Sequence, residues 1–521
     1  MFARIKRVEN RQYLQLVENY WEAGRSHQRV IATLGRLDDL QVTGKLDAAV
    51  KSLARFATKL KVIEDHQNGH LRVHSVQRIG PDLVLSRLWE RLGLKDVLTG
   101  LLAGRRYDFA VERAIYFTVL SRLFFPGADQ RAWRQARDYR ITGTAELKLH
   151  HLYRAMAWLG QVKDEVEERL FARNRNLFTG LDLVFFDTTS LYFEGQGGES
   201  LGQYGYSKDG CPDKHQMIVG AVLDRGGRPI SCPMWPGNTT DVKTLQPVVE
   251  RLRNRFGVSD VVVAADRGMI SQKTQEWLEA TKIGYILGAR MRTVKAIKFD
   301  VLDAPGAYED VQENLKVKEV VVAGKRYVVC FNPEEAKQDA HVRTATVESL
   351  RRKLAASPRS VVGNHGYRRY LKIDRQAVTI VEEKIKADER FDGKYVLQTS
   401  TELPAAEVAL RYKELWQVER VFREVKSVLA TRPVYHKYDL TIQGHVFCSF
   451  LALVVMKELM SGAGETTNWD VIRQDLDALY ETEVEREGNR YQLRGPYLGT
   501  SRAILKAVGV AAPPAISAPR A

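Results

Sequence analysis

Two apolar runs that each stop at an aspartate constrain the fold of this chain most. The runs are L-V-F-F-D, which ends at Asp187, and V-V-V-A-A-D, which ends at Asp266. Short runs rich in Val and Phe are typical of buried strands. Because ligand-binding loops gather at the carboxyl ends of strands in open α/β sheets, we expect both carboxylates to lie at one edge of a sheet.

The segments around these two runs predict an α/β core. Alternating apolar residues between the runs predict antiparallel strands over 216–223 and 230–234, and a helix follows over 244–256. After Asp266 the pattern predicts a further helix and then a short strand. This order of elements is the order of a ribonuclease-H-like core.

Residues 291–399 predict an insertion into this core. Their β-rich pieces, such as K-E-V-V-V-A-G-K-R-Y-V-V-C, are separated by a polar helical stretch over 347–354. A bare core needs far fewer residues before its last helix. We therefore expect a β-rich domain between the two parts of the catalytic core, 179–290 and 400–460.

The rest of the chain predicts three further regions. Alternation typical of strands gives way to a helical pattern within residues 1–75, which indicates a small β-hairpin and a helix. Residues 76–178 predict a helical domain that opens with a proline in its first helical turn. Residues 461–521 predict a helical region that ends in a disordered tail.

The charge distribution favours a polyanionic partner for the front of the chain. The net charge is +15, and residues 1–180 hold 31 Lys and Arg against 20 Asp and Glu. Phosphate contacts supply most of the non-specific affinity of proteins for DNA. A basic front end joined to an acidic site is typical of a DNA-processing enzyme, so we predict that both N-terminal regions bind DNA.

No segment predicts export or a membrane span. The start M-F-A-R-I-K-R lacks an apolar stretch of the signal-peptide type, and the longest apolar run, over 447–456, is shorter than the roughly 20 residues that span a bilayer. The four cysteines show no C-x-x-C spacing, which disfavours a zinc ribbon and a disulfide framework. We expect a cytoplasmic, nucleoid-associated protein without a membrane partner.

Four arginines recur at every third position in R-A-W-R-Q-A-R-D-Y-R. On a helix they trace a slowly drifting stripe, which is either a solvated face or a phosphate-binding surface. The stripe consists of Arg131, Arg134, Arg137 and Arg140.

A third acid lies in Y-K-E-L-W-Q-V-E-R-V-F-R-E-V-K. Spacings of seven and four predict one helix face that carries Tyr412, Glu419, Arg423 and Lys426. This face is either an amphipathic surface with i,i+4 ion pairs, or a site where Glu419 ligates a metal and the other side chains contact DNA phosphates. With the first two aspartates, three carboxylates suit a pair of magnesium ions.

The stretch around Glu419 resembles the Y-x2-R-x3-E-x6-K signature of bacterial insertion-sequence transposases with a DDE site. Tyr412, Glu419 and Lys426 match its tyrosine, glutamate and lysine, whereas Leu415 takes the place of its arginine. The segments F-F-D-T-T-S-L-Y-F-E-G and V-V-A-A-D-R-G-M-I-S resemble the first and second acid motifs of the same family. The resemblance covers residues 180–460.

This resemblance implies a ribonuclease-H-like fold whose metal ligands are Asp187, Asp266 and Glu419. It implies two Mg²⁺ ions as cofactors, which Mn²⁺ can replace, and DNA nicking followed by strand transfer. The implied partners are double-stranded DNA of the element ends and of the target. Joining two ends implies a homodimer.

Two other functions fit the same residues. One is a ribonuclease-H-like nuclease that cuts without joining, and the other is a non-catalytic DNA-binding protein that represses the element by occupying its ends. The presence of all three acids and of the following lysine favours an active enzyme.

Several other residues carry weaker signals. His436, His445 and Cys448 fit no standard zinc spacing, so we predict no metal site there. Three acids near the first two motifs are interpreted as turn or cap residues, namely Asp209, Asp213 and Asp241.

Overall fold

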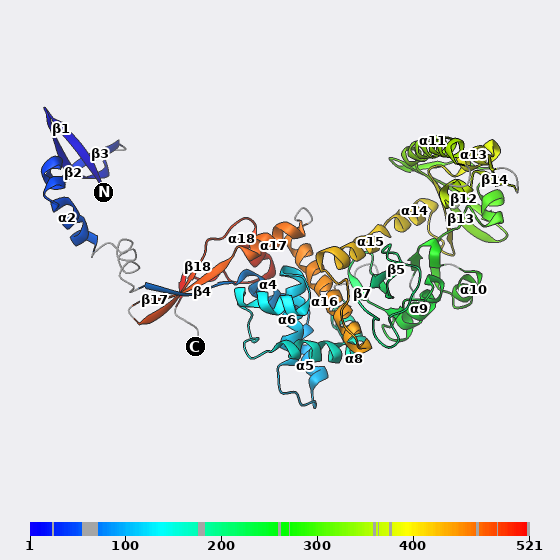
Figure 1. Ribbon diagram of the computed structural model, residues 1–521, viewed down its shortest axis with the longest axis horizontal. Coiled ribbons are helices and arrows are strands. Elements are labelled where there is room, and N and C mark those ends of the chain that lie inside the picture. Colours follow the sequence, from blue (N-terminus) through cyan, green and yellow to red (C-terminus); the bar gives the residue numbers. More distant parts are fainter. Residues whose placement is uncertain are drawn as a thin grey trace. The chain divides into compact units, whose positions relative to one another are not determined.

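A ten-stranded mixed sheet organises the larger of two units into which the chain divides (Figure 1). This unit comprises Ile79–Ala478 and Tyr497–Ala512, and the smaller comprises Met1–Arg78, Leu479–Pro496 and Pro513–Ala521. The computed structural model describes residues 1–22, 25–54, 71–175, 183–258, 262–269, 271–357, 361–362, 364–374, 378–464, 468–486 and 488–517.

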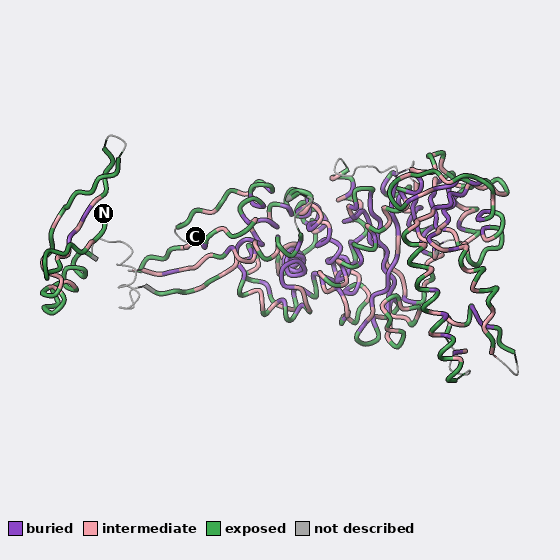
Figure 2. Tube along the Cα trace, turned by 90° about the horizontal axis from the view of Figure 1, so that it is seen from above, coloured by how far each residue is buried: buried purple, intermediate pink, exposed green. Residues whose placement is uncertain are grey.

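The smaller unit begins with a three-stranded antiparallel sheet rather than a single hairpin. Its strands, in spatial order, are β1 (Phe2–Val8), β2 (Arg11–Glu22) and β3 (Arg25–Arg36). Two helices follow, α1 (Leu37–Val42) and α2 (Lys45–Ala54). Most residues of the sheet are exposed and appear green in Figure 2. The helical pattern predicted beyond Ala54 lies outside the described residues.

A second sheet of this unit joins segments from both ends of the chain. Its spatial order is β19 (Ile516–Ser517), β18 (Asn489–Arg494), β17 (Tyr480–Arg486) and β4 (Leu71–Arg78). The predicted helical C-terminal region therefore also contains three strands, and the predicted disordered tail includes β19 up to Ser517. The alternation of Tyr480, Thr482 and Val484 with glutamates is the period-two signal for β17.

Helices form the first and last parts of the larger unit. The first set is α4 (Gly80–Arg91), α5 (Leu94–Leu102), α6 (Val111–Phe124), α7 (Asp129–Gln135) and α8 (Leu149–Arg173). The last set is α16 (Asp439–Ala463), α17 (Trp469–Asp477) and α18 (Ser501–Val508). α16 packs along α8 and also contacts α6, so segments far apart in sequence share one helical core.

Two glycines allow α8 and α16 to approach at backbone distance. A Cβ on Gly160 of α8 would overlap the carbonyl oxygen of Leu440, and a Cβ on Gly444 of α16 would overlap that of Met156.

Within the described chain, α16 is the one helix long and apolar enough to cross a membrane, and 78% of its apolar window is buried. Its apolar character therefore fits a core helix.

The central sheet is parallel in its middle, over β5 (Leu183–Tyr192), β9 (Val262–Ala265) and β10 (Gly284–Gly288), and antiparallel on both sides. β5 pairs in parallel with β9, which pairs in parallel with β10. On its other edge β5 pairs antiparallel with β6 (Gln216–Leu223). The single strand predicted over 230–234 is two short strands that both pair with β6, namely β7 (Pro229–Ser231) and β8 (Met234–Pro236).

The inserted region continues this same sheet beyond β10. Its added strands, from the outer edge inward, are β11 (Glu309–Gln312), β12 (Leu315–Val322), β13 (Lys325–Phe331) and β16 (Lys394–Thr399). A separate two-stranded sheet pairs β14 (Leu371–Ile373) with β15 (Val378–Ile380), and the short helices are α12 (His365–Arg368) and α13 (Glu382–Asp388).

The insertion also contains a long helix, so it is mixed rather than mainly β. α11 (Pro333–Ala356) has 24 residues, whereas the sequence pattern predicted a helix only over 347–354. Asn332 caps it by accepting hydrogen bonds from the backbone N–H groups of Glu334 and Glu335. The N-cap Asn followed by a proline at the first helical position is the start signal that the apolar pattern did not show.

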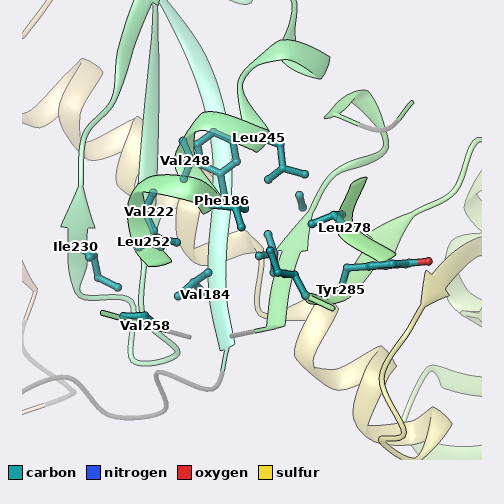
Figure 3. Close-up of a cluster of buried hydrophobic side chains, with 14 of the residues drawn as sticks. Val184, Phe186, Val222, Ile230, Leu245, Val248, Leu252, Val258, Leu278 and Tyr285 are labelled. Atoms are coloured by element: carbon teal, nitrogen blue, oxygen red, sulfur yellow. The ribbon is translucent and has the colours of Figure 1, made fainter. Parts of the chain in front are cut away.

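Two helices cover the central strands on one face. α9 (Leu245–Asn254) and α10 (Gln272–Ala280) bury apolar side chains against Val184 and Phe186 of β5 (Figure 3). Side chains alternate across a strand, so Phe185 and Asp187 point to the opposite face. α15 (Trp416–Arg423) packs against β5 and β6.

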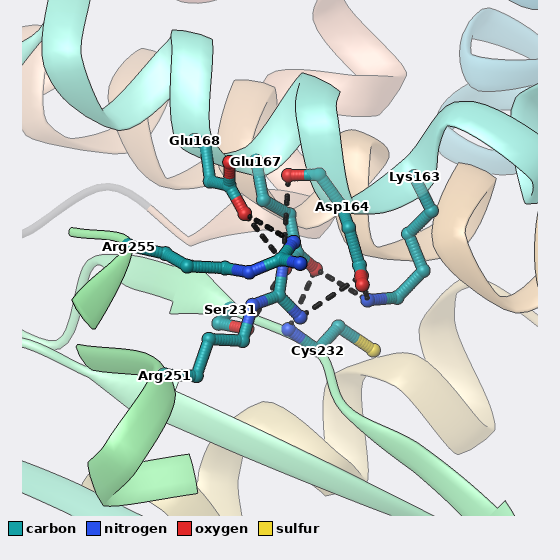
Figure 4. A network of polar contacts seen from close by, with 8 residues as sticks. All are labelled: Lys163, Asp164, Glu167, Glu168, Ser231, Cys232, Arg251 and Arg255. Atoms are coloured by element: carbon teal, nitrogen blue, oxygen red, sulfur yellow. Dashed lines mark hydrogen bonds and ion pairs between the residues drawn. The ribbon is translucent and has the colours of Figure 1, made fainter. Parts of the chain in front are cut away.

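A buried charge network fastens α8 to this sheet (Figure 4). The carboxylate of Glu167 accepts hydrogen bonds from the Ser231 hydroxyl at 2.8 Å and from the Cys232 backbone N–H at 2.9 Å. It also pairs with Lys163 at 3.1 Å and with Arg251 of α9 at 2.9 Å. The Glu167 side chain is fully buried, so these contacts compensate a charge that is removed from water.

The close approach of α8 and α16 predicts a strong position dependence for glycine substitution. Gly444→Ala should lower the free energy of unfolding by about 1–3 kcal/mol, because the added methyl group meets backbone that has little room to move. Gly462→Ala, on the same helix as Gly444, is the matched control. A Cβ at Gly462 meets no neighbouring atom within 4 Å. This substitution should change stability by less than about 1 kcal/mol. Urea unfolding followed by circular dichroism measures both, and equal effects would contradict the close contact.

Candidate active site

The parallel register of β5 and β9 places Asp187 beside Asp266. Phe185 pairs with Ala264 and Phe186 pairs with Ala265, so the next residue along each segment is an aspartate. Neighbouring strands lie about 4.8 Å apart. The two acids predicted from the apolar runs therefore lie side by side where β9 ends. β5 continues past Asp187 to Tyr192, so the prediction of a strand that stops at Asp187 is wrong.

The electrostatics of Asp187 reflect this crowding. Burial raises the pKa of the Asp187 carboxyl to about 6, against the opposing effects of the Lys208 ammonium and of the Thr188 N–H. The negative charges of Asp266 and Asp241 contribute to the same rise. A positive ion among these carboxylates would relieve their mutual repulsion.

Asp241 is a third acid of this cluster, and we had interpreted it only as a turn or cap residue. It does begin a 3₁₀ turn, η3 (Asp241–Lys243). In addition, its Oδ1 accepts a hydrogen bond from the Thr188 hydroxyl at 2.7 Å, and its Oδ2 pairs with Lys208 Nζ at 3.0 Å. Asp241 is therefore both the first residue of this turn and a member of the carboxylate cluster.

Lys208 is the cation of the cluster, and no sequence motif predicts its role. Its Nζ donates hydrogen bonds to the Thr188 carbonyl oxygen at 2.9 Å and to the Thr188 hydroxyl at 2.8 Å. Lys208 lies in the segment G-Y-S-K-D-G between the first two acid motifs, where no periodicity marks it. Because these donor bonds and the Asp241 ion pair hold it, the ammonium lies next to the first acid.

Lys426 is held by a buried carboxylate. Its Nζ lies 2.6 Å from Asp209 Oδ1, and Arg432 Nη1 lies 2.7 Å from the same oxygen. The Asp209 side chain is only 3% exposed, so the two cations compensate a buried charge. Burial lowers the pKa of Lys426, whereas Asp209 raises it. Asp209 is therefore an ion-pair partner as well as a loop residue.

We predicted that Tyr412 and Glu419 lie on one continuous α-helix. This prediction is wrong, because the two residues lie on separate helices. α14 (Ala405–Lys413) ends before α15 begins, and between them the N–H of Leu415 bonds to the carbonyl three residues earlier. A π-helical turn, η8 (Glu424–Val428), then carries Lys426. The tight turn and the wide turn each change the helical phase, so spacings of seven do not define one face.

The hydroxyl of Tyr412 donates a hydrogen bond to Asp266 Oδ1 at 3.2 Å. Its ring stacks on that of Tyr395, with the ring centroids 6.1 Å apart. The structure thus brings Tyr412 to the second acid, whereas the sequence analysis assigned it to the DNA backbone. A phenol in this position orients the carboxylate of Asp266.

Glu419 and Arg423 are both exposed on α15. Neither side chain forms a hydrogen bond or an ion pair with the part of the chain that the structure describes, so the i,i+4 pair that spacing allowed is not formed. Glu419 makes no contact of this kind with Asp187 or Asp266. The neighbouring Val418 and Phe422 are buried where α15 packs on β5 and β6.

The predicted arginine stripe is interrupted after its second member. Arg131 and Arg134 lie on α7, but Arg137 lies in the 3₁₀ turn η1 (Ala136–Asp138) and Arg140 lies beyond it. Tyr139, directly after this turn, is buried, and its ring centroid lies 4.4 Å from that of Phe125. The first three arginines are exposed and Arg140 is half-buried.

His436 and His445 meet Asp129 rather than Cys448. The potential ligand atoms of these three residues lie within 4.8 Å of one another. However, the buried guanidinium of Arg122 lies 2.7 Å from His445 Nδ1 and 3.4 Å from Asp129 Oδ1. A fixed positive charge at this position disfavours a metal cation, so we interpret the group as a polar network.

Comparison with known families identifies the region around Asp187 and Asp266. Residues 179–455, more than half of the chain, match the model of the transposase DDE domain, and residues 3–66 match that of the IS1634 family transposase N-terminal domain. The chain belongs to the DDE transposase family. The predicted resemblance to insertion-sequence transposases is thereby confirmed. No curated protein matches the chain.

DDE transposases generally use a divalent metal. The residues present here fit such an ion, because the carboxylates of Asp187, Asp266 and Asp241 are hard oxygen donors gathered at one place. The pKa of Asp187 is raised mainly by burial, and the charges of Asp266 and Asp241 act in the same direction.

The different surroundings of two cations in this transposase predict different effects on stability. Lys426→Met should lower the free energy of unfolding by about 1–3 kcal/mol, because buried Asp209 loses one of its two ion-pair partners. Arg423→Met is the control, since this exposed side chain has no ion pair among the described residues. It should change stability by less than about 0.5 kcal/mol. Urea unfolding tests this difference, and equal losses would contradict it.

Proposed function

We propose that this transposase binds the terminal inverted repeats of its insertion sequence and catalyses magnesium-dependent DNA cleavage and strand transfer. The observation that carries the proposal is the adjacency of Asp187 and Asp266 on paired parallel strands within a DDE domain. The sheet order β7–β6–β5–β9–β10, parallel from β5 to β10, supports a ribonuclease-H-like core.

The metal ligands in this proposal are Asp187, Asp266 and Glu419. Two Mg²⁺ ions, replaceable by Mn²⁺, supply an activated oxygen nucleophile and neutralise charge on the leaving oxygen when they are bound. The adjacency of Asp187 and Asp266 supports the assignment of the two aspartates, and the match to the Y-x2-R-x3-E-x6-K signature supports that of Glu419. Asp241 is a further oxygen donor within the same cluster.

Other side chains of the chain orient this site. The Tyr412 hydroxyl restrains Asp266, and the Thr188 N–H donates to Asp187 Oδ1 at 2.6 Å. Asp241 and the Thr188 carbonyl hold the Lys208 ammonium beside the acids, where it can contact a phosphate oxygen. Positioning and charge neutralisation carry phosphoryl transfer, and no side chain needs to form a covalent intermediate.

Glu419 enters the acid set from α15. The packing of this helix on β5 and β6 keeps its exposed carboxylate on the segment that covers the strand of Asp187. Arg423 is available to hold a phosphate oxygen. Lys426 contributes a second positive charge, and its ammonium also forms an ion pair with Asp209.

The DNA partner in this proposal contacts the basic N-terminal regions as well as the site. Phosphate contacts from the exposed arginines of α7 and its following turn would position the duplex without reading its sequence. We propose residues 1–75 and 76–178 as DNA-binding regions ahead of the core and its insertion. A homodimer would pair the two element ends for joining.

Neutralising substitutions of the three acids test the proposed reaction. With labelled DNA that carries the ends of its own element, Asp187→Asn, Asp266→Asn and Glu419→Gln should each lower cleavage and joining by at least about a hundredfold. End binding should persist in a mobility-shift assay. The control is Asp213→Asn, an exposed acid of the same domain, which should retain both activities.

Three outcomes would contradict this assignment in different ways. Cleavage without joined products would indicate a nuclease. End binding by the wild type without cleavage in Mg²⁺ or Mn²⁺ would indicate a repressor of the element. Cleavage that survives Glu419→Gln would mean that another residue is the third acid.

A further inference from the structure

The ammonium of Lys208, on the loop between β5 and β6, has acceptors for all of its N–H groups. It donates to the carbonyl oxygen of Thr188 at 2.9 Å and to the Thr188 hydroxyl at 2.8 Å, and it pairs with Asp241 Oδ2 at 3.0 Å. A lysine ammonium has three N–H donors, and three acceptors surround this one. A DNA phosphate can therefore engage Lys208 only by replacing one of these acceptors.

The charge of Lys208 acts on the carboxylates of the proposed metal site. Burial raises the pKa of the Asp187 carboxyl, and the Lys208 ammonium is the largest opposing influence. A Cβ at Gly268, two residues after Asp266, would lie 3.5 Å from Asp241 Oδ2. The oxygen that pairs with Lys208 thus also lies beside the turn of the second acid. The ammonium occupies the position of a counterion between the two acid motifs.

A group of further cations lies next to Lys208. Asp209, the following residue, pairs with Lys426 at 2.6 Å and with Arg432 at 2.7 Å. Burial lowers the pKa of Lys426, and the positive charges of Arg432 and Lys208 act in the same direction. Lys426 is therefore within electrostatic reach of two other cations. Such a group suits a phosphate, which accepts several charge-assisted hydrogen bonds.

The side chain of Lys208 can exchange one of these environments for the other. Its backbone N–H donates to the Ser190 hydroxyl at 2.9 Å, which fixes the loop to β5. The four-carbon stem beyond the backbone is flexible, and the side chain is 26% exposed. The ammonium can therefore turn from Asp241 to a bound phosphate while its backbone stays in place.

We propose that Lys208 is an internal counterion that couples metal binding to DNA binding. In the DNA-free protein its ammonium neutralises the carboxylates and competes with a divalent cation for them. A phosphate beside Lys426 and Arg432 draws the ammonium away, and the carboxylates then bind the cation more tightly. Lys208 is thus a positioning residue. The inference rests on the proposed function, because it requires that Asp187 and Asp266 bind a divalent metal.

Mn²⁺ binding, followed by electron paramagnetic resonance, tests this coupling without a catalytic readout. Without DNA, Lys208→Met should bind Mn²⁺ at least about fivefold more tightly than the wild type, because the competing charge is gone. Damage to the site would weaken binding instead. Lys208→Arg keeps the charge and should bind Mn²⁺ as weakly as the wild type.

The DNA in this test is a duplex with one element end, whose nicked strand terminates in a dideoxynucleotide and so lacks a reactive 3′-hydroxyl. It should raise the Mn²⁺ affinity of the wild type by a similar factor, and that of Lys208→Met by less. The Mn²⁺ that counts is the part that Asp187→Asn removes, because DNA itself also binds the ion.

Lys243→Met is the matched control, an exposed lysine two residues after Asp241 that forms no ion pair with the described residues. Without DNA, its Mn²⁺ affinity should stay within about twofold of the wild type, since solvent screens an exposed charge. Unchanged or weaker binding by Lys208→Met would overturn the counterion assignment, as would a wild type whose Mn²⁺ affinity does not respond to DNA. If Asp187→Asn removes no bound Mn²⁺ with or without DNA, the proposed function is overturned as well.

Discussion

The parallel pairing of β5 with β9 is the constraint on which the rest of this transposase depends. Backbone hydrogen bonds fix the register, and the register sets Asp187 beside Asp266 at the point where β9 ends. A slip of one residue would turn every side chain of the strand to the other face, so the apolar contacts of Val184 and Phe186 hold the register in place. Core packing and the position of the carboxylates are thus one property of the sheet.

The surroundings of this pair are built from compensated charges. Asp241 fixes Lys208, Asp209 holds Lys426, and the network around Glu167 ties α8 to the sheet edge. Each pair is removed from water to a large extent, so its geometry is specified more strongly than that of an exposed ion pair. Glu419 and Arg423 differ from these pairs, because both are exposed and neither forms an ion pair with the described residues. Their charges are therefore available to a ligand.

The sequence alone predicted the elements that follow from local pattern. Asp187 and Asp266 are marked in the sequence because each follows a continuous apolar run on a buried strand, although β5 itself continues past Asp187 to Tyr192. Asp241 and Lys208 were missed because their contact depends on the paths of two loops, which no periodicity records. The break before α15 was also missed: the segment contains no Gly or Pro, and the break separates the contact of Tyr412 with Asp266 from the packing of Val418 on the sheet.

The central claim is that Asp187, Asp266 and Glu419 together bind divalent metal. With added hydrogen peroxide and ascorbate, ferrous iron bound in place of magnesium reduces the peroxide to hydroxyl radicals that cut the protein near the iron ligands, and mass spectrometry locates the cuts. The account predicts cuts near Asp187, Asp266 and Glu419 on the DNA-bound protein, all suppressed by excess Mg²⁺. Cuts that cluster elsewhere, or that persist in excess Mg²⁺, would contradict it.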